Sequence, residues 1–285
     1  MPQVELPSLF LNSEQQGRDI RTMNVELQRG LFFPSAERIY ANITQAVIPY
    51  SFVNISTPVY KNACFHVNII ANALPTTSFT GDLHLPAGIY PSLTELSEAI
   101  NALIRDALGL PATDTTIFVD ITANTSTNQV IVEVFNPNGL YLGPEINFQC
   151  GTPPTSSLYT ELGLPLGTTV AFGVTNPVVS SGPVLFNDRF AAGILIICEG
   201  DLNVMTYLQN VPNANVLAQV PLTNADSVGS VITYPRDLTV IQCPVIQGKT
   251  IRKFKIRFVS PLEPTTDLIF LQGNASVVIL FKAVY

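Results

Sequence analysis

The stretch TIRKFKIRFVS, residues 250–260, alternates basic and apolar side chains through its centre. The basic residues are Lys253, Lys255 and Arg257, and the apolar residues between and after them are Phe254, Ile256 and Phe258. Successive side chains of a β-strand point to opposite faces of the sheet. The pattern therefore predicts a strand whose apolar side chains enter a core while its basic side chains face outward.

Short extended runs of this kind recur along much of the chain, separated by many of its 22 prolines and 17 glycines. The predicted strands are residues 38–47, 50–55, 63–71, 191–198, 215–221, 231–234, 238–243, 250–260, 268–271 and 276–284. The run AAGILIIC, residues 191–198, is continuously apolar, which predicts a strand buried on both faces. Many short strands with turn signals at intervals of roughly ten residues are typical of a β-sandwich or jelly roll.

One helix interrupts the strands, over residues 92–108. Ser92 and Glu95 have the spacing of a capping box, in which the serine accepts a hydrogen bond from the third amide of the helix. Gly109 and Pro111 end the helix. Its apolar stripe consists of Leu93, Leu96, Ile100, Leu103 and Ala107. We expect this amphipathic helix to pack one face on a sheet.

The helix belongs to a region of mixed structure. A hairpin of residues 116–122 and 129–135 follows it, then a short strand over residues 145–150 and a short helix over 156–162. We therefore divide the chain into an arm, a main β domain and an inserted domain. The arm is residues 1–35, the main β domain is residues 36–79 and 176–285, and the inserted small α+β domain is residues 80–175.

The composition favours an assembling protein. Apolar residues make up 47% of the chain, and charged residues only 12%, about half the roughly 25% usual in globular domains. A chain with so many apolar and so few charged residues is expected to expose apolar patches, and large exposed apolar patches usually mark interaction sites. Within the arm, Leu9, Phe10, Phe32 and Phe33 are candidate contacts to neighbouring subunits.

The charge of the chain argues against a general nucleic-acid coat. The net charge is −7 and the isoelectric point is about 4.8, whereas nucleic-acid-binding domains usually exceed roughly 9. Contact with genome phosphate stays an alternative for the basic strand, which carries Lys253, Lys255 and Arg257. We favour a solvated edge strand or a contact with an acidic neighbour.

Sequence motifs for catalysis or cofactor binding are missing. The chain has no GxSxG, P-loop, HExxH or GxGxxG pattern. Asp82 and His84 flank Leu83 and share a strand face, which we interpret as a hydrogen-bonded surface pair. We expect no catalytic residue, no cofactor and no metal.

The cysteines and the hydrophobic segments bear on where the chain folds. The four cysteines are Cys64, Cys150, Cys198 and Cys243. They are far apart and include no CxxC pair, which is typical of buried free thiols and of folding in a reducing compartment. The first ten residues do not resemble a secretory signal, and no apolar run has the length of a membrane span.

Two segments resemble the penton, or minor capsid, proteins of mavirus-like virophages and of polinton-like viruses. The first is LHLPAGIYPSLTELSEAINALIRDAL, residues 83–108, together with ELGL at residues 161–164. The second combines VLAQVPL at residues 216–222, ITYP at 232–235 and the strands around 249–258 and 268–281. With the stretches between them, these segments cover roughly two thirds of the chain.

The resemblance implies a structural protein with one jelly roll and an outward-facing inserted domain. It implies a homopentamer at the fivefold vertices of an icosahedral virion, in contact with a hexon-like major capsid protein. The inserted domain would be available to a host receptor or glycan. It also implies production in the host cytoplasm or a viral factory, and it brings no catalytic residues to carry over.

Two other classes of function stay open. A viral attachment or carbohydrate-binding β-sandwich would use aromatic residues such as Tyr141, Tyr159 and Phe172 on the inserted domain, although tryptophan is absent. A β-sandwich hydrolase would need several polar side chains that converge on one site. The chain has only two histidines and no cluster of acidic residues, which argues against this class of enzyme.

Overall fold

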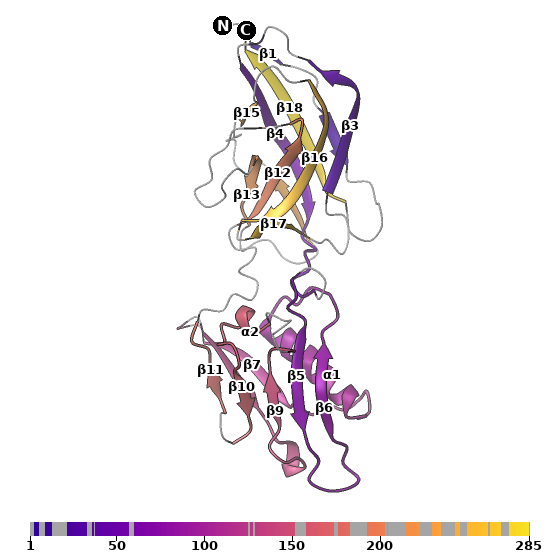
Figure 1. Ribbon diagram of the computed structural model, residues 1–285, viewed down its shortest axis with the longest axis vertical. Helices are drawn as coiled ribbons and strands as arrows, with labels where there is room; N and C mark the ends of the chain where they lie inside the picture. The colour runs from indigo at the N-terminus through magenta and orange to yellow at the C-terminus, as the bar shows by residue number, and fades with distance from the viewer. Residues whose placement is uncertain are drawn as a thin grey trace. The chain divides into compact units, whose positions relative to one another are not determined.

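The computed structural model divides the chain into two compact units (Figure 1). The sandwich unit comprises Met1–Phe52 and Arg189–Tyr285, and the inserted unit comprises Val53–Asp188. The structure describes residues 3–5, 9–12, 22–32, 36, 38–56, 60–124, 126–127, 129–151, 158–173, 176–182, 193–202, 204, 215–222, 230–234, 243–245, 250–261, 263–268 and 274–284. The described part is mainly β, as the sequence predicts, and all its strand pairs are antiparallel.

The sandwich unit contains two sheets. The strands of the first are β1 (Gln3–Glu5), β2 (Leu9–Asn12), β4 (Arg38–Pro49), β14 (Val231–Tyr234), β15 (Cys243–Val245) and β18 (Ser276–Val284). The strands of the second are β3 (Thr22–Leu31), β12 (Ile194–Gly200), β13 (Val216–Val220), β16 (Ile251–Ser260) and β17 (Glu263–Asp267). β4 and β18 form the longest ladder of the first sheet, and β16 is central in the second because it pairs with β12, β3 and β17.

The core of the sandwich unit lies between these sheets. Alternate side chains point into it, such as Ile43 and Phe281 from the first sheet and Ile256 and Phe258 from the second. Each fully buried side chain of this size contributes about 1.5–3 kcal/mol of hydrophobic stabilisation. β12 is buried on both faces from Ile194 to Cys198, which confirms the prediction from its continuous apolar run.

The described residues of the N-terminal segment (3–5, 9–12 and 22–32) pair with the sandwich unit and do not form a free arm. β1 and β2 pair with β18, and β3 pairs with β16, so the described part of this segment extends both sheets. Met23, Val25 and Leu27 face the core at alternate positions of β3. This spacing of two is the ordinary strand signal, and it explains why the segment folds onto its own unit.

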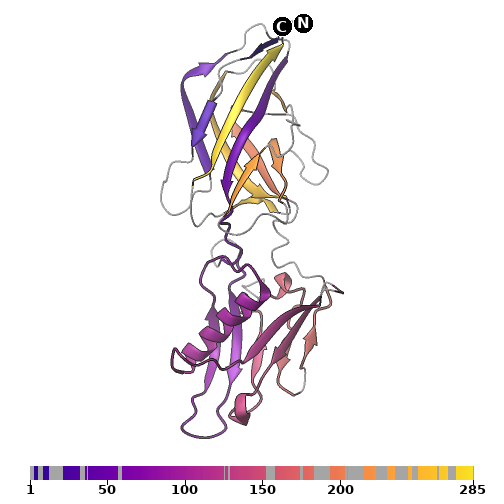
Figure 2. The same ribbon diagram turned by 180° about the vertical axis from the view of Figure 1, so that it is seen from behind.

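The described residues of the inserted unit form two smaller sheets, one long helix and two short helical segments. One sheet has the order β10 (Thr169–Ala171), β9 (Glu145–Asn147), β5 (Cys64–Ile69) and β6 (Phe79–His84). The other has the order β11 (Val178–Val179), β8 (Gln129–Val134) and β7 (Val119–Asn124). The helices are α1 (Leu93–Ala107), α2 (Leu158–Glu161) and the 3-10 turn η1 (Pro137–Gly139). Helix α1 packs on β7 and β6, and Figure 2 shows it in front of the strands.

The boundaries of this unit differ from those that the sequence predicts. We expected residues 53–79 in the main β domain, but β5 pairs with β6 on one edge and β9 on the other. Asn54 holds the loop before α1, because its side chain accepts from the Tyr90 amide and donates to the Tyr90 carbonyl. At the other end β11 pairs with β8, so residues 176–182 belong to the inserted unit as well.

Helix α1 has the predicted caps. The Ser92 hydroxyl accepts a hydrogen bond from the Glu95 amide at 3.2 Å, and Gly109 has a φ of 69°, in the left-handed region. Leu96 and Ile100 are fully buried, as the stripe predicts. The sequence did not reveal that Ser97 and Asn101 share the buried face.

Asn101 joins helix α1 to the start of β7. Its side-chain oxygen accepts from the amides of Phe118 and Val119 at 2.7 and 3.0 Å. Its amide group donates to the carbonyls of Ser97 and Val119 at 2.9 and 2.7 Å. One buried side chain therefore satisfies backbone groups that would otherwise lose their hydrogen bonds on folding.

Replacing Asn101 by alanine should lower the free energy of unfolding of the inserted unit by about 2 kcal/mol or more, because it leaves buried backbone groups unpaired. Urea denaturation measures the change. Glu98→Ala, at an exposed position of the same helix, should change it by less than about 0.5 kcal/mol. Equal effects of the two substitutions would contradict the role given to Asn101.

Candidate functional site

The basic strand is β16, and its side chains alternate as predicted. Phe254, Ile256 and Phe258 are buried in the sandwich core. Lys253 and Lys255 lie on the opposite face. The pattern in the sequence therefore predicts both the strand and the face of each residue.

Arg257 is held in place by two carboxylates. Its Nη1 donates to Glu199 Oε1 at 2.6 Å and its Nε donates to Asp267 Oδ1 at 2.5 Å. Burial alone lowers the pKa of Arg257, but the hydrogen bonds and charges of Glu199 and Asp267 outweigh it and raise the pKa. The side chain is only 14% exposed. Arg257 therefore joins β12, β16 and β17 and has little capacity left for an outside ligand.

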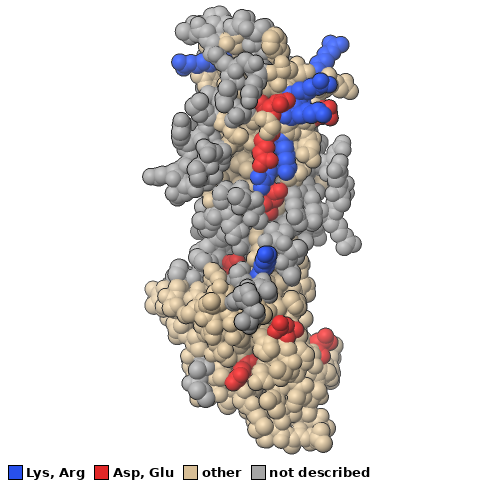
Figure 3. Space-filling view, viewed as in Figure 1, with Lys and Arg blue, Asp and Glu red and all other residues tan. Residues whose placement is uncertain are grey.

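Other basic side chains of β16, Lys253 and Lys255, lie near acidic residues. Lys253 Nζ contacts Glu26 Oε1 at 2.9 Å, and this hydrogen bond lowers the pKa of Glu26. The two residues border an open groove of about 480 Å³. The groove is lined by Asn24, Val25, Glu26, Glu199, Gly200, Lys253, Phe254 and Lys255. Figure 3 shows acidic side chains next to basic ones over the sandwich unit, so this surface is of mixed charge.

The four apolar residues of the N-terminal segment have different positions. Leu9 is partly buried against the core of its own sandwich unit. Phe10 lies in β2 opposite Val278, and its side chain is outside the described residues, as is the whole of Phe33. Phe32 is 63% exposed. Of the four residues, Phe32 is the one that the structure shows as an exposed apolar side chain.

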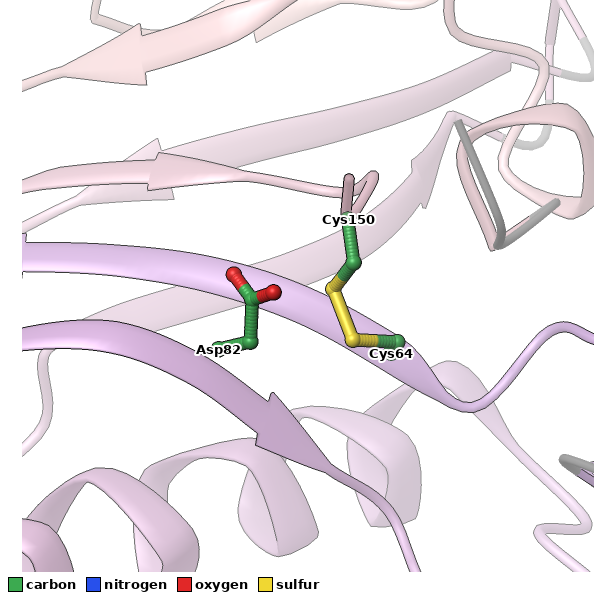
Figure 4. A group of neighbouring side chains, drawn as sticks. All are labelled: Cys64, Asp82 and Cys150. Carbon is green, nitrogen blue, oxygen red and sulfur yellow. A yellow bond between two sulfur atoms is a disulfide. The ribbon is translucent and has the colours of Figure 1, made fainter. Parts of the chain in front are cut away.

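A second polar region lies on the inserted unit, on the face of β5 and β6 away from the core. Cys64 is bonded to Cys150 in a disulfide, with their Cα atoms 5.9 Å apart (Figure 4). The expectation of free thiols was therefore wrong for these two residues, because the fold brings together cysteines that are 86 residues apart. Cys198 is a buried free thiol, as predicted, and the side chain of Cys243 is outside the described residues.

Both histidines of the chain lie beside this disulfide. His84 Nε2 is 3.6 Å from Cys64 Sγ. Asp82 pairs with His66 across the strands, with Nδ1 and Oδ1 2.7 Å apart, and not with His84 as the sequence suggested. Asp82 and His84 lie on the same face of β6, two residues apart. His66 lies directly opposite Asp82 on β5, and directly opposite residues of an antiparallel pair are closer than residues two apart on one strand.

The inserted unit also has an apolar tip, which we define as residues 70–78 and 136–143. Leu74 is 94% exposed, and Ile70, Leu140 and Leu142 are exposed as well. The two loops are joined by hydrogen bonds from the Asn72 amide to the Leu140 carbonyl and from the Leu142 amide to the Ile70 carbonyl. Neither loop contains a charged residue. An exposed apolar group without charge is typical of an interaction surface.

Of the aromatic residues proposed for ligand binding, only Tyr141 lies in the tip, and its side chain is not exposed there. Tyr141 is buried against Phe118, and Tyr159 packs partly on the core of the inserted unit. Phe172 is exposed. Among the described residues, no helix is both long and apolar enough to cross a membrane.

Comparisons with known proteins give structural likenesses only. No protein-family model and no curated protein matches the sequence. The chain is similar to the solved structure of the mavirus penton protein, with a TM-score of 0.47 and 9% identity over 100% of both chains. It is also similar to a chain in the cryo-EM structure of the Sputnik virophage, with a TM-score of 0.39 and 11% identity over 96% of this chain and 97% of that chain.

Replacing Arg257 by glutamine should lower the free energy of unfolding by about 1–3 kcal/mol, because Glu199 and Asp267 lose their common partner in a partly buried site. Lys255→Gln on the same strand face is the control and should have little effect. Urea denaturation of both variants measures the difference. A stable Arg257→Gln variant would show that the three charges do not hold the strands together.

Proposed function

We propose that this chain is a structural capsid protein that forms pentamers at the fivefold vertices of an icosahedral virion. The observation that carries the proposal is the organisation of the chain. An antiparallel sandwich is interrupted in sequence by a complete second unit with its own core. This is the arrangement implied by the family that residues 83–108 and 216–281 resemble, and we interpret the sandwich unit as its single jelly roll.

The surface chemistry supports assembly through the sandwich unit. Charged residues are depleted in the centres of protein interfaces, and this chain has about half the usual number. Two of the four cations of β16 are paired with acids: Lys253 with Glu26, and Arg257 with Glu199 and Asp267. We therefore assign this strand to contacts with a neighbouring subunit or the major capsid protein, and not to the genome. Exposed Phe32 is the apolar contact that we assign to the same neighbours.

The mass of the purified protein tests the proposal. Light scattering should give a species near five times 30.9 kDa, and negative-stain images should show fivefold views. Phe32→Asp should shift this species toward smaller forms, whereas Lys61→Gln in the inserted unit should leave it unchanged. A trimer, or a monomer that does not enter shells formed with the major capsid protein, would contradict the assignment.

A second function, attachment to a host, is supported by the apolar tip. The tip exposes leucine side chains without charges, which suits the apolar surface of a receptor protein better than a polar glycan. This role is compatible with the first, because the tip belongs to the inserted unit and the assembly contacts are assigned to the sandwich unit. We propose that residues 70–78 and 136–143 bind a host surface protein.

Substituting Leu74 and Leu142 by aspartate should reduce binding to host cells at least about tenfold, because two charges would be placed in an apolar contact. Adsorption of labelled protein to cells measures the loss. Leu166→Asp, at an exposed position outside the two loops, is the matched control. Unchanged adsorption of the double variant would remove the tip from any attachment role.

A further inference from the structure

We propose that the site of the Cys64–Cys150 disulfide binds one zinc ion when the disulfide is reduced. The ligands are the two cysteine sulfurs, His84 Nε2 and a carboxylate oxygen of Asp82. The proposal goes beyond the capsid role and does not depend on it, since it concerns only side chains of the inserted unit.

Three of the four ligand atoms lie close together, and the fourth, His84 Nε2, lies close to one of them. The ligand atoms of Cys64, Cys150 and Asp82 all lie within 4.8 Å of one another (Figure 4). His84 Nε2 lies 3.6 Å from Cys64 Sγ. Atoms bound to a tetrahedral zinc at ~2.0–2.3 Å lie roughly 3.3–3.8 Å apart. The histidine and the first cysteine therefore already have the separation of two zinc ligands.

The sheet fixes most of this arrangement. Cys64 lies opposite His84 in the β5–β6 ladder, and His66 lies opposite Asp82, so these four side chains share one face. Cys150 follows β9, whose Asn147 lies opposite His66 on the other edge of β5. Binding of zinc would require the two sulfurs to move apart by side-chain rotation, while the strands stay in register.

The surroundings of the ligands also suit a metal. His66 is hydrogen-bonded to one oxygen of Asp82 at 2.7 Å, which orients the carboxylate and leaves its other oxygen available. Partners of this kind are typical of the second shell of zinc sites. Cys64 and Cys150 are buried, whereas His66 and Asp82 are 42% and 44% exposed. An ion therefore has access from solvent to a partly buried set of ligands.

The oxidised site becomes the zinc-bound site in two steps, reduction of the disulfide and binding of the ion. A dithiol reductant gives two electrons and two protons to the disulfide, which becomes two thiols, and the reductant becomes a disulfide. Zinc then binds as both thiols lose their protons to solvent, since the thiolate is the ligand. The bound site has two thiolates, one carboxylate and a neutral histidine around Zn²⁺. Oxidation by a disulfide reverses the sequence and releases the ion.

Cobalt substitution tests the proposal on the full-length protein. The protein is reduced with a phosphine, freed of metal and titrated with Co²⁺ without oxygen. We expect one equivalent to give the thiolate-to-cobalt charge-transfer band and the visible bands of a tetrahedral site, and Zn²⁺ to abolish both. The oxidised protein should give neither. Absence of these bands from the reduced protein would overturn the proposal.

Variants identify the ligands. His84→Asn and Asp82→Asn keep both cysteines, so circular dichroism of their oxidised forms shows whether they fold. Each should lose the tetrahedral spectrum or bind Co²⁺ at least about tenfold more weakly, and His66→Asn should weaken binding roughly 10–100-fold. Cys198→Ser and Cys243→Ser are the controls and should leave the spectrum unchanged. A spectrum that survives Cys64→Ser with Cys150→Ser, or that depends on Cys198 or Cys243, would refute the assigned site.

Discussion

The pairing of β4 with β18 is the constraint on which the rest of the structure depends. It joins residues 38–47 to residues 276–284, so the sandwich unit closes only when segments from opposite ends of the chain meet. The inserted unit lies between them in sequence and has its own buried core, with Phe65, Phe118 and Phe148 fully buried. Because the entropy of closing a loop grows slowly with its length, a folded insertion costs the β4–β18 pairing little. One chain can therefore carry an assembly domain and a separately folded second unit.

The two units present different chemistry to their surroundings. In the sandwich unit, Lys253 and Arg257 of β16 are paired with Glu26, Glu199 and Asp267, so acidic side chains offset part of the positive charge of the strand. Such a surface suits contacts between like subunits, where unpaired charge would be costly to bury. The inserted unit instead combines an apolar tip with a polar sheet face that carries both histidines and a disulfide. The proposed functions follow this division: assembly by the sandwich, and recognition and metal chemistry by the insertion.

Local patterns in the sequence predicted local structure well. The caps of α1, the alternation of β16 and the double-sided burial of β12 depend on neighbouring residues, so they were visible in the sequence. Other features join residues that are far apart in sequence, and no periodic pattern of residues predicts them. Examples are the pairing of β5, the hydrogen bonds of Asn101 and the Cys64–Cys150 disulfide. The N-terminal segment is a different case. The alternation in β3 was present, but the polar residues between its apolar positions made it resemble a free arm.

Cryo-EM of shells assembled from this chain and its major capsid protein tests the central claim most directly. We expect five copies of the sandwich unit around each fivefold axis, with β16 facing a neighbouring subunit or the major capsid protein. Density for the chain away from the fivefold axes, or fivefold positions filled without it, would contradict the account.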